Sequence, residues 1–161
     1  MKRRILALFP ADFHKNPVHF QALGLAFVFT VLSLAQLFTF EHFGDVTLGY
    51  GLPGGIFVAT ILAFLLPAAE ILSLPYLLSM RLPAKLYFVS RISVLVTGSL
   101  WVCVALWTNL TGNTATNAGM FGATLHTPNH WWFIIFVILL LWASWLMYAA
   151  KPRRNRLHHT M

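Results

Sequence analysis

Four stretches of the chain are long and apolar enough to cross a lipid bilayer, and they limit the possible folds more than any other feature. A spanning helix needs about 20 residues, because it rises ~1.5 Å per residue. The expected spans are residues 18–40, 55–80, 86–107 and 131–150. Backbone polar groups inside lipid must be bonded within the protein, so each span is expected to be a helix. We therefore predict an all-α fold, an integral membrane four-helix bundle in which residues 1–161 form a single transmembrane domain.

Composition supports the membrane class. The chain is 58% hydrophobic and only 9% charged, which lies outside the range of soluble globular proteins. The N-terminal segment begins with the basic residues typical of a signal peptide, but Pro10 and Asp12 interrupt its apolar part. Residues 1–16 are therefore interpreted as a retained amphipathic segment on the membrane surface. Residues 151–161 form a basic C-terminal tail.

The basic residues predict the orientation. All eleven Lys and Arg residues lie before the first span, between the second and third spans, just inside the third span, or after the fourth. The loops on the opposite side, 41–54 and 108–130, contain none. The positive-inside rule then places both termini in the cytoplasm. This bias, with attraction to anionic lipid, accounts for the net charge of +7, so nucleic acid is not expected as a partner.

Redox-active thiols and metal sites are not expected. The single cysteine, Cys103, is interpreted as a small buried apolar residue, and one thiol alone cannot run a dithiol cycle. Histidines and carboxylates occur in both outer loops, but their spacing matches no compact metal motif. These residues are Glu41, His42, Asp45, His126 and His130.

A polar centre is predicted within the second span, in the segment "LLPAAEILSLPYLL". This segment places Glu70 between Pro67 and Pro75, and a lone charge in hydrocarbon costs about 3 kcal/mol or more. Glu70 must therefore be protonated, hydrated or paired. The prolines leave backbone carbonyls without their helical donors, and Gln36 and Ser73 are candidates to bind such groups or the head group of a quinone. Both a functional site and a purely structural kink fit this pattern.

Arg91 is a candidate partner of Glu70. The connection between the second and third spans is short, so these spans are expected to form an antiparallel hairpin. Counted from the turn, Glu70 and Arg91 then lie at nearly the same depth, roughly 12–16 Å into the membrane. The two could pair and form a catalytic centre. Alternatively, the long side chain of Arg91 could reach the cytoplasmic interface.

The segment 32–78 resembles the DoxX-like family of four-span bacterial membrane proteins, which includes the MauE-type proteins. The resemblance rests on the loop aromatics Phe40 and Phe43, the turn Gly51-Leu52-Pro53 and Glu70. The family's Gly-x-x-Lys motif is replaced here by Ser33-Leu34-Ala35-Gln36. The resemblance implies a four-helix fold in the bacterial inner membrane and an association with quinone-linked redox systems.

Three functions are considered. The first is a small subunit or anchor of a larger redox or energy-transducing membrane complex, without catalytic activity of its own and contacting partner subunits through loops 41–54 and 108–130. The second, implied by the resemblance, is a quinone-linked oxidoreductase component in which Glu70 transfers the quinol proton and Arg91 holds its charge state. The third is a small transporter or a maturation helper. No intrinsic cofactor is expected, apart from a bound quinone in the second case.

Overall fold

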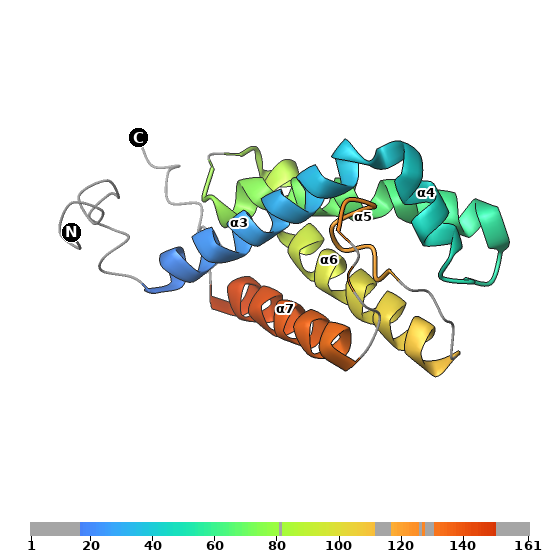
Figure 1. Cartoon of the computed structure of the whole chain (residues 1–161). Coiled ribbons are helices and arrows are strands. Elements are labelled where there is room, and N and C mark those ends of the chain that lie inside the picture. Colours follow the sequence, from blue (N-terminus) through green and yellow to red (C-terminus); the bar gives the residue numbers. More distant parts are fainter. Residues whose placement is uncertain (1–16, 81, 112–116, 126, 128–130, 151–161) are drawn as a thin grey trace, which may run out of the picture.

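The computed structural model describes residues 17–80, 82–111, 117–125, 127 and 131–150. These parts of the chain contain helices and no strands, as predicted (Figure 1). The helices are α3 (Pro17–Phe38), α4 (Phe40–Leu48), α5 (Gly55–Leu77), α6 (Ala84–Leu110) and α7 (Trp131–Ala150). Four of them, α3, α5, α6 and α7, are long and apolar enough to cross a membrane. The described residues therefore have the helices of a multi-pass membrane protein.

The helix bounds correct several predicted limits. Helix α3 ends at Phe38 rather than at residue 40, α5 ends at Leu77 rather than at residue 80, and α6 extends beyond the predicted 86–107 at both ends. The fourth span was predicted correctly as 131–150. The predicted surface segment 1–16 and basic tail 151–161 lie outside the described residues.

The predicted outer loop 41–54 is wrong over its first half, which forms helix α4. Its buried residues Phe43 and Thr47 are four apart and therefore share one face of the helix. The hydroxyl of Thr47 donates to the backbone oxygen of Ala59 on α5 at 3.0 Å. A helix of nine residues is too short to cross a bilayer, which is why hydropathy alone did not indicate it.

The helices pack against one another so that neighbours in sequence are neighbours in space, and we use the word bundle below for this set of helices, α3 to α7. Helix α5 packs against α3, α4 and α6, and α6 packs against α7. We call the end of the bundle where α3 begins and α7 ends the terminal end, and the end with α4 the loop end (Figure 1). Helices α3 and α7 touch much less than α5 and α6 or α6 and α7 do, and a groove lies between them.

Both prolines of α5 lie inside a continuous helix. Just after Pro75, the backbone N–H of Tyr76 donates to the hydroxyl of Ser90 on α6 at 2.9 Å. The Tyr76 hydroxyl donates to the backbone oxygen of Met147 on α7 at 3.0 Å. The end of α5 is thus fastened to both following helices where the proline weakens its own hydrogen bonding.

The outward faces of the long helices carry many exposed apolar side chains, which suits contact with lipid. Cys103 belongs to this outward surface, so its predicted burial is wrong. Its neighbours in sequence explain the difference. Val104 and Ala105 occupy the buried face of α6, and a residue one position earlier turns away from that face.

Candidate functional site

The carboxyl group of Glu70 lies at the centre of the bundle, fully shielded from solvent. The indole N–H of Trp101 on α6 donates to Glu70 Oε1 at 2.9 Å. The side-chain amide of Gln36 on α3 donates to the same oxygen at 3.2 Å. Three helices therefore meet at one carboxyl oxygen, and both donors are uncharged.

Arg91 does not pair with Glu70. Its guanidinium donates to the backbone oxygen of Tyr148 at 3.0 Å and lies over the ring of the same tyrosine, 4.2 Å from its centroid. Tyr148 is in the last turn of α7, where carbonyls lack intrahelical donors and the helix dipole favours a cation. Arg91 thus caps a helix end at the terminal end of the bundle, and no described basic side chain forms an ion pair with Glu70.

Two acceptor atoms in this centre have no hydrogen-bond partner. They are Glu70 Oε2 and Gln36 Oε1, and both are buried. An unpaired buried acceptor costs about 1–3 kcal/mol, so two in one centre call for an explanation. Each atom can accept a hydrogen bond from a hydroxyl group, and Glu70 Oε2 can itself carry the proton of a carboxylic acid. Ser73, the other residue predicted to bind a cofactor, instead donates to the backbone oxygen of Glu70.

Residues 117–125 of the second outer loop cover this centre at the loop end. Met120 is buried, and its backbone oxygen accepts the second N–H of the Gln36 amide at 3.1 Å. The backbone N–H of Ala123 donates to the hydroxyl of Thr39 at 2.9 Å. The loop is closed on itself through Asn117, whose side-chain oxygen accepts from the backbone N–H groups of Gly119 and Thr127.

Two glycines allow the loop to sit this deeply. Gly119 and Gly122 have φ values of 70° and 62°, which favour glycine. A Cβ at Gly122 would clash with the Thr39 hydroxyl and lie 2.7 Å from the backbone oxygen of Ala35. A Cβ at Gly119 would clash with the hydroxyl of Tyr50. The backbone of the loop therefore packs directly against α3 and against Tyr50.

Tyr50 holds the loop from the other side. It lies between α4 and α5, is fully buried, and donates its hydroxyl to the backbone oxygen of Ala118 at 2.8 Å. Burial raises the pKa of Tyr50 above its ordinary value, because the charged phenolate would lose its hydration. The hydroxyl therefore keeps its proton at physiological pH and remains a donor to the loop.

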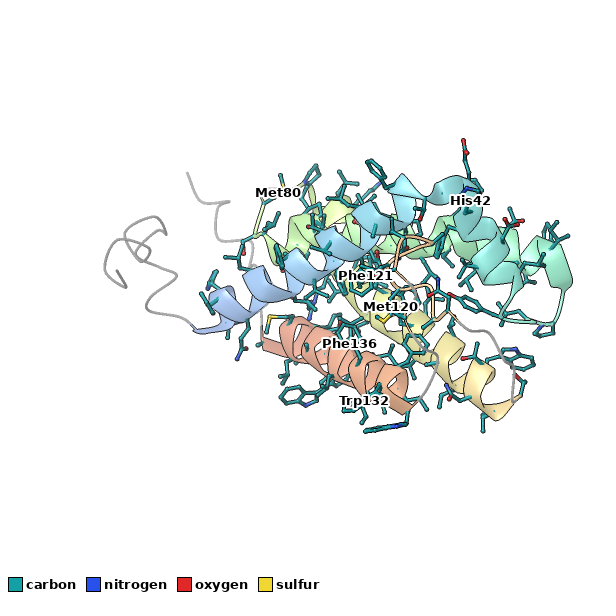
Figure 2. The ribbon with its side chains drawn as sticks, in the orientation of Figure 1. His42, Met80, Met120, Phe121, Trp132 and Phe136 are labelled. Carbon is teal, nitrogen blue, oxygen red and sulfur yellow. The ribbon has the colours of Figure 1, made fainter. Side chains whose placement is uncertain are left out.

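An apolar pocket of about 400 Å³ lies beside the centre, between this loop and α7. Met120 and Phe133 line it, and each also contacts the centre. Met120 binds Gln36, and the ring of Phe133 meets the ring of Trp101 edge to face at 6.1 Å. Figure 2 shows Met120, Phe121 and Phe136 close together, with Trp132 nearer the start of α7. The lining of this pocket is connected to the carboxyl group through Gln36 and Trp101.

Sequence reasoning missed Trp101, which donates the shorter of the two hydrogen bonds to the Glu70 carboxyl group. A signal was present, because Ser93, Thr97 and Trp101 recur every fourth residue and form one polar, buried face of α6. A tryptophan in the middle of a span brings an N–H group that needs an acceptor in lipid. The one carboxylate in any span was the obvious acceptor.

No protein-family model, curated protein or solved structure matches the chain. The described residues contain no group of three metal-ligating side chains. Of the acidic and histidine side chains predicted for the outer side, Glu41, His42 and Asp45 lie on α4, whereas His126 and His130 are outside the described residues.

Proposed function

We propose that the protein is a small subunit of a quinone-linked redox or energy-transducing membrane complex, and that Glu70 exchanges a proton with quinol. The supporting observation is the buried carboxyl group, which has one bonded oxygen, one unpartnered oxygen and no counter-ion among the side chains that the structure describes. An ionisable side chain inside a membrane is costly and is commonly functional. A subunit that only anchors a complex would have no use for a buried carboxyl group.

The roles of the surrounding side chains follow from their contacts. Trp101 and Gln36 hold Oε1 and orient the carboxyl group, which leaves Oε2 to accept a proton. The unpartnered Gln36 Oε1 fits a hydroxyl donor such as that of a quinol. Oxidation of a quinol releases two protons and two electrons. Glu70 takes one proton, the second proton passes to water at the membrane surface, and the two electrons pass to an oxidised redox centre on a partner subunit.

Glu70→Gln is expected to abolish this proton exchange while the fold is kept, because glutamine has nearly the same shape and still accepts from Trp101. The measurement is the infrared difference spectrum between membranes with a reduced and an oxidised quinone pool. A carboxylic acid band should appear for the wild type and be lost in Glu70→Gln. Glu41→Gln on the exposed face of α4 is the matched control and should keep the band. An unchanged band in Glu70→Gln contradicts the proposal.

The subunit role draws support from α4. Glu41, His42 and Asp45 are exposed on this helix, and His42 points away from the bundle in Figure 2. A polar face beyond the apolar belt suits a partner outside the membrane. Mass spectrometry of the proteins that co-purify from native membranes in mild detergent should find redox subunits in a fixed ratio. Purification of the chain alone, or only with copies of itself, would argue against a subunit.

The orientation proposed with this function places both termini in the cytoplasm and the bundle in a bacterial inner membrane. Its support is the sequence position of the eleven basic residues relative to the four long helices. Residues 117–125, which cover the centre, then lie on its periplasmic side.

A further inference from the structure

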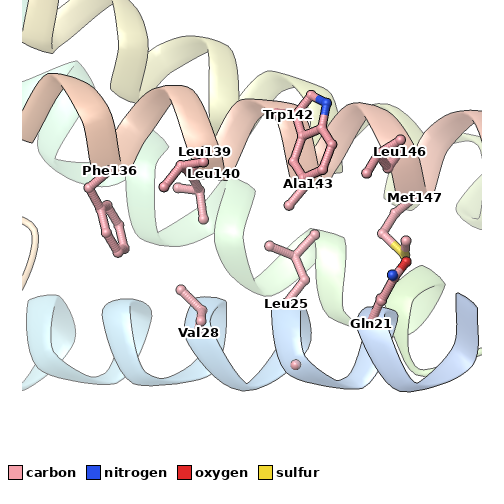
Figure 3. Close-up of a pocket in the computed structure, with 11 residues that line it drawn as sticks. Gln21, Leu25, Val28, Phe136, Leu139, Leu140, Trp142, Ala143, Leu146 and Met147 are labelled. Carbon is pink, nitrogen blue, oxygen red and sulfur yellow. The ribbon is translucent and has the colours of Figure 1, made fainter. Parts of the chain in front are cut away.

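The groove between α3 and α7 has the size and position of a lipid-binding site. It encloses about 390 Å³. Figure 3 shows Leu25 and Val28 of α3 on one side and Leu139 and Ala143 of α7 on the other. We propose that this groove binds one acyl chain of an anionic phospholipid.

The lining explains why the groove remains open. Gly24 lies on its α3 side, and a Cβ placed there would meet no other atom within 4 Å. Ala143 is the small residue on the opposite helix. By contrast, α6 and α7 approach so closely at Gly98 that a Cβ would lie 3.0 Å from the Cα of Leu141. The glycine at position 98 therefore lets α6 and α7 pack closely. Gly24 and Ala143 lie where α3 and α7 are further apart, and because both residues are small, the space between these helices stays unfilled.

The surroundings identify the occupant as a lipid chain. The groove is continuous with the lipid-facing surface, where Leu139 and Trp142 are both lining residues and largely exposed. Along α7 it extends from Phe136 to Met147, a rise of about 16 Å. This is close to half of a hydrocarbon core of about 30 Å. A single leaflet therefore supplies a chain of matching length.

Charge identifies the head group. Gln21 lies at the terminal end of the groove, opposite Met147 (Figure 3). Two basic residues of the described part, Lys85 and Arg91, lie in the first turns of α6, after the end of α5. Arg91 lies against Tyr148, one residue after Met147. An anionic phosphate head group would be attracted there, and the Gln21 amide would be a polar neighbour for it.

The test is native mass spectrometry of the full chain, purified in mild detergent with equal amounts of phosphatidylglycerol and phosphatidylcholine. The wild type should retain one phosphatidylglycerol. Gly24→Leu adds a side chain on the α3 side of the groove, where a Cβ meets no other atom within 4 Å, and it should lower the bound fraction about tenfold. Ala68→Leu, at an exposed position of α5 outside the groove, is the matched control and should retain the lipid.

Three results would overturn the proposal: equal retention by Gly24→Leu and the wild type, equal retention of the two lipids, or a second protein chain in place of the lipid. Circular dichroism checks that the helices of each variant are intact. If Gly24→Leu fails to fold, Ala143→Leu fills the groove from α7 and is judged by the same outcomes. The proposal does not depend on Glu70, so it can fail or succeed separately from the proposed redox function.

Discussion

Trp101→Ala is expected to lower the free energy of unfolding by about 3–5 kcal/mol, the usual cost of removing a large buried aromatic side chain. Trp101 is fully buried and joins two parts of the core. Its N–H donates to Glu70 on α5, and its ring packs against Phe133 on α7. The substitution leaves a cavity and removes the shorter of the two hydrogen bonds to Glu70 Oε1. The measurement is unfolding of the purified protein in mixed micelles with increasing denaturing detergent.

Two further substitutions separate the cavity from the lost hydrogen bond. Trp101→Phe keeps an aromatic ring but loses the N–H donor, so it should cost about 1–3 kcal/mol. Trp142→Ala removes an exposed tryptophan from α7 and should change stability by less than about 0.5 kcal/mol. The expected order of stability is wild type and Trp142→Ala, then Trp101→Phe, then Trp101→Ala. Equal stability of Trp101→Ala and Trp142→Ala would show that the Glu70–Trp101 contact does not support the bundle.

Gly98→Leu is expected to separate α6 from α7. A Cβ at Gly98 would lie 3.0 Å from the Cα of Leu141 and 3.4 Å from the hydroxyl oxygen of Ser144. The Cα is backbone and cannot turn aside, so α7 itself must move. Extra atoms in such a close contact cost about 1–3 kcal/mol, and the leucine adds three carbons beyond the Cβ. Close approach through glycine is also a main source of helix association inside membranes.

The readout for Gly98→Leu is again detergent-induced unfolding, with Gly24→Leu as the control. Both variants place leucine at a glycine inside a long helix, so they gain the same intrinsic helix propensity. At Gly24 nothing lies within 4 Å of the new Cβ, and stability should be unchanged or slightly higher. A loss of stability at Gly24 equal to that at Gly98 would mean that close packing of α6 on α7 is not the cause.

The partner of Glu70 could not be predicted by counting residues from the inner turn. The count assumed that α5 and α6 run side by side from a symmetric turn, and it placed Glu70 opposite Arg91. In the structure Glu70 meets Trp101, ten residues further along α6 than Arg91. Arg91 is instead bound by the last turn of α7. Depth along a helix follows from sequence, but rotation and crossing of helices depend on the packing of all their side chains.

The position of residues 117–125 over Glu70 could not be predicted from the sequence either. Residues 117–125 are rich in small and polar side chains, and they were predicted to belong to an outer loop that contacts partner subunits. Their burial depends on contacts far apart in the chain, such as Gln36 with Met120 and Tyr50 with Ala118. The fit of Gly122 against α3 is also a property of the assembled bundle. No local pattern records such contacts.

By itself, the sequence determined the all-helical class, the four long apolar helices and the presence of a carboxylate inside one of them. These are local properties, because lipid requires about 20 apolar residues and complete backbone hydrogen bonding within each span. Only the tertiary structure decided that Trp101 and Gln36 hold Glu70, that residues 117–125 cover it, and that a groove lies between α3 and α7. The hydrophobic effect inserts all four spans in the same way and does not select which helix faces contact each other. Small residues, the fit of side chains and a few hydrogen bonds between helices make that selection.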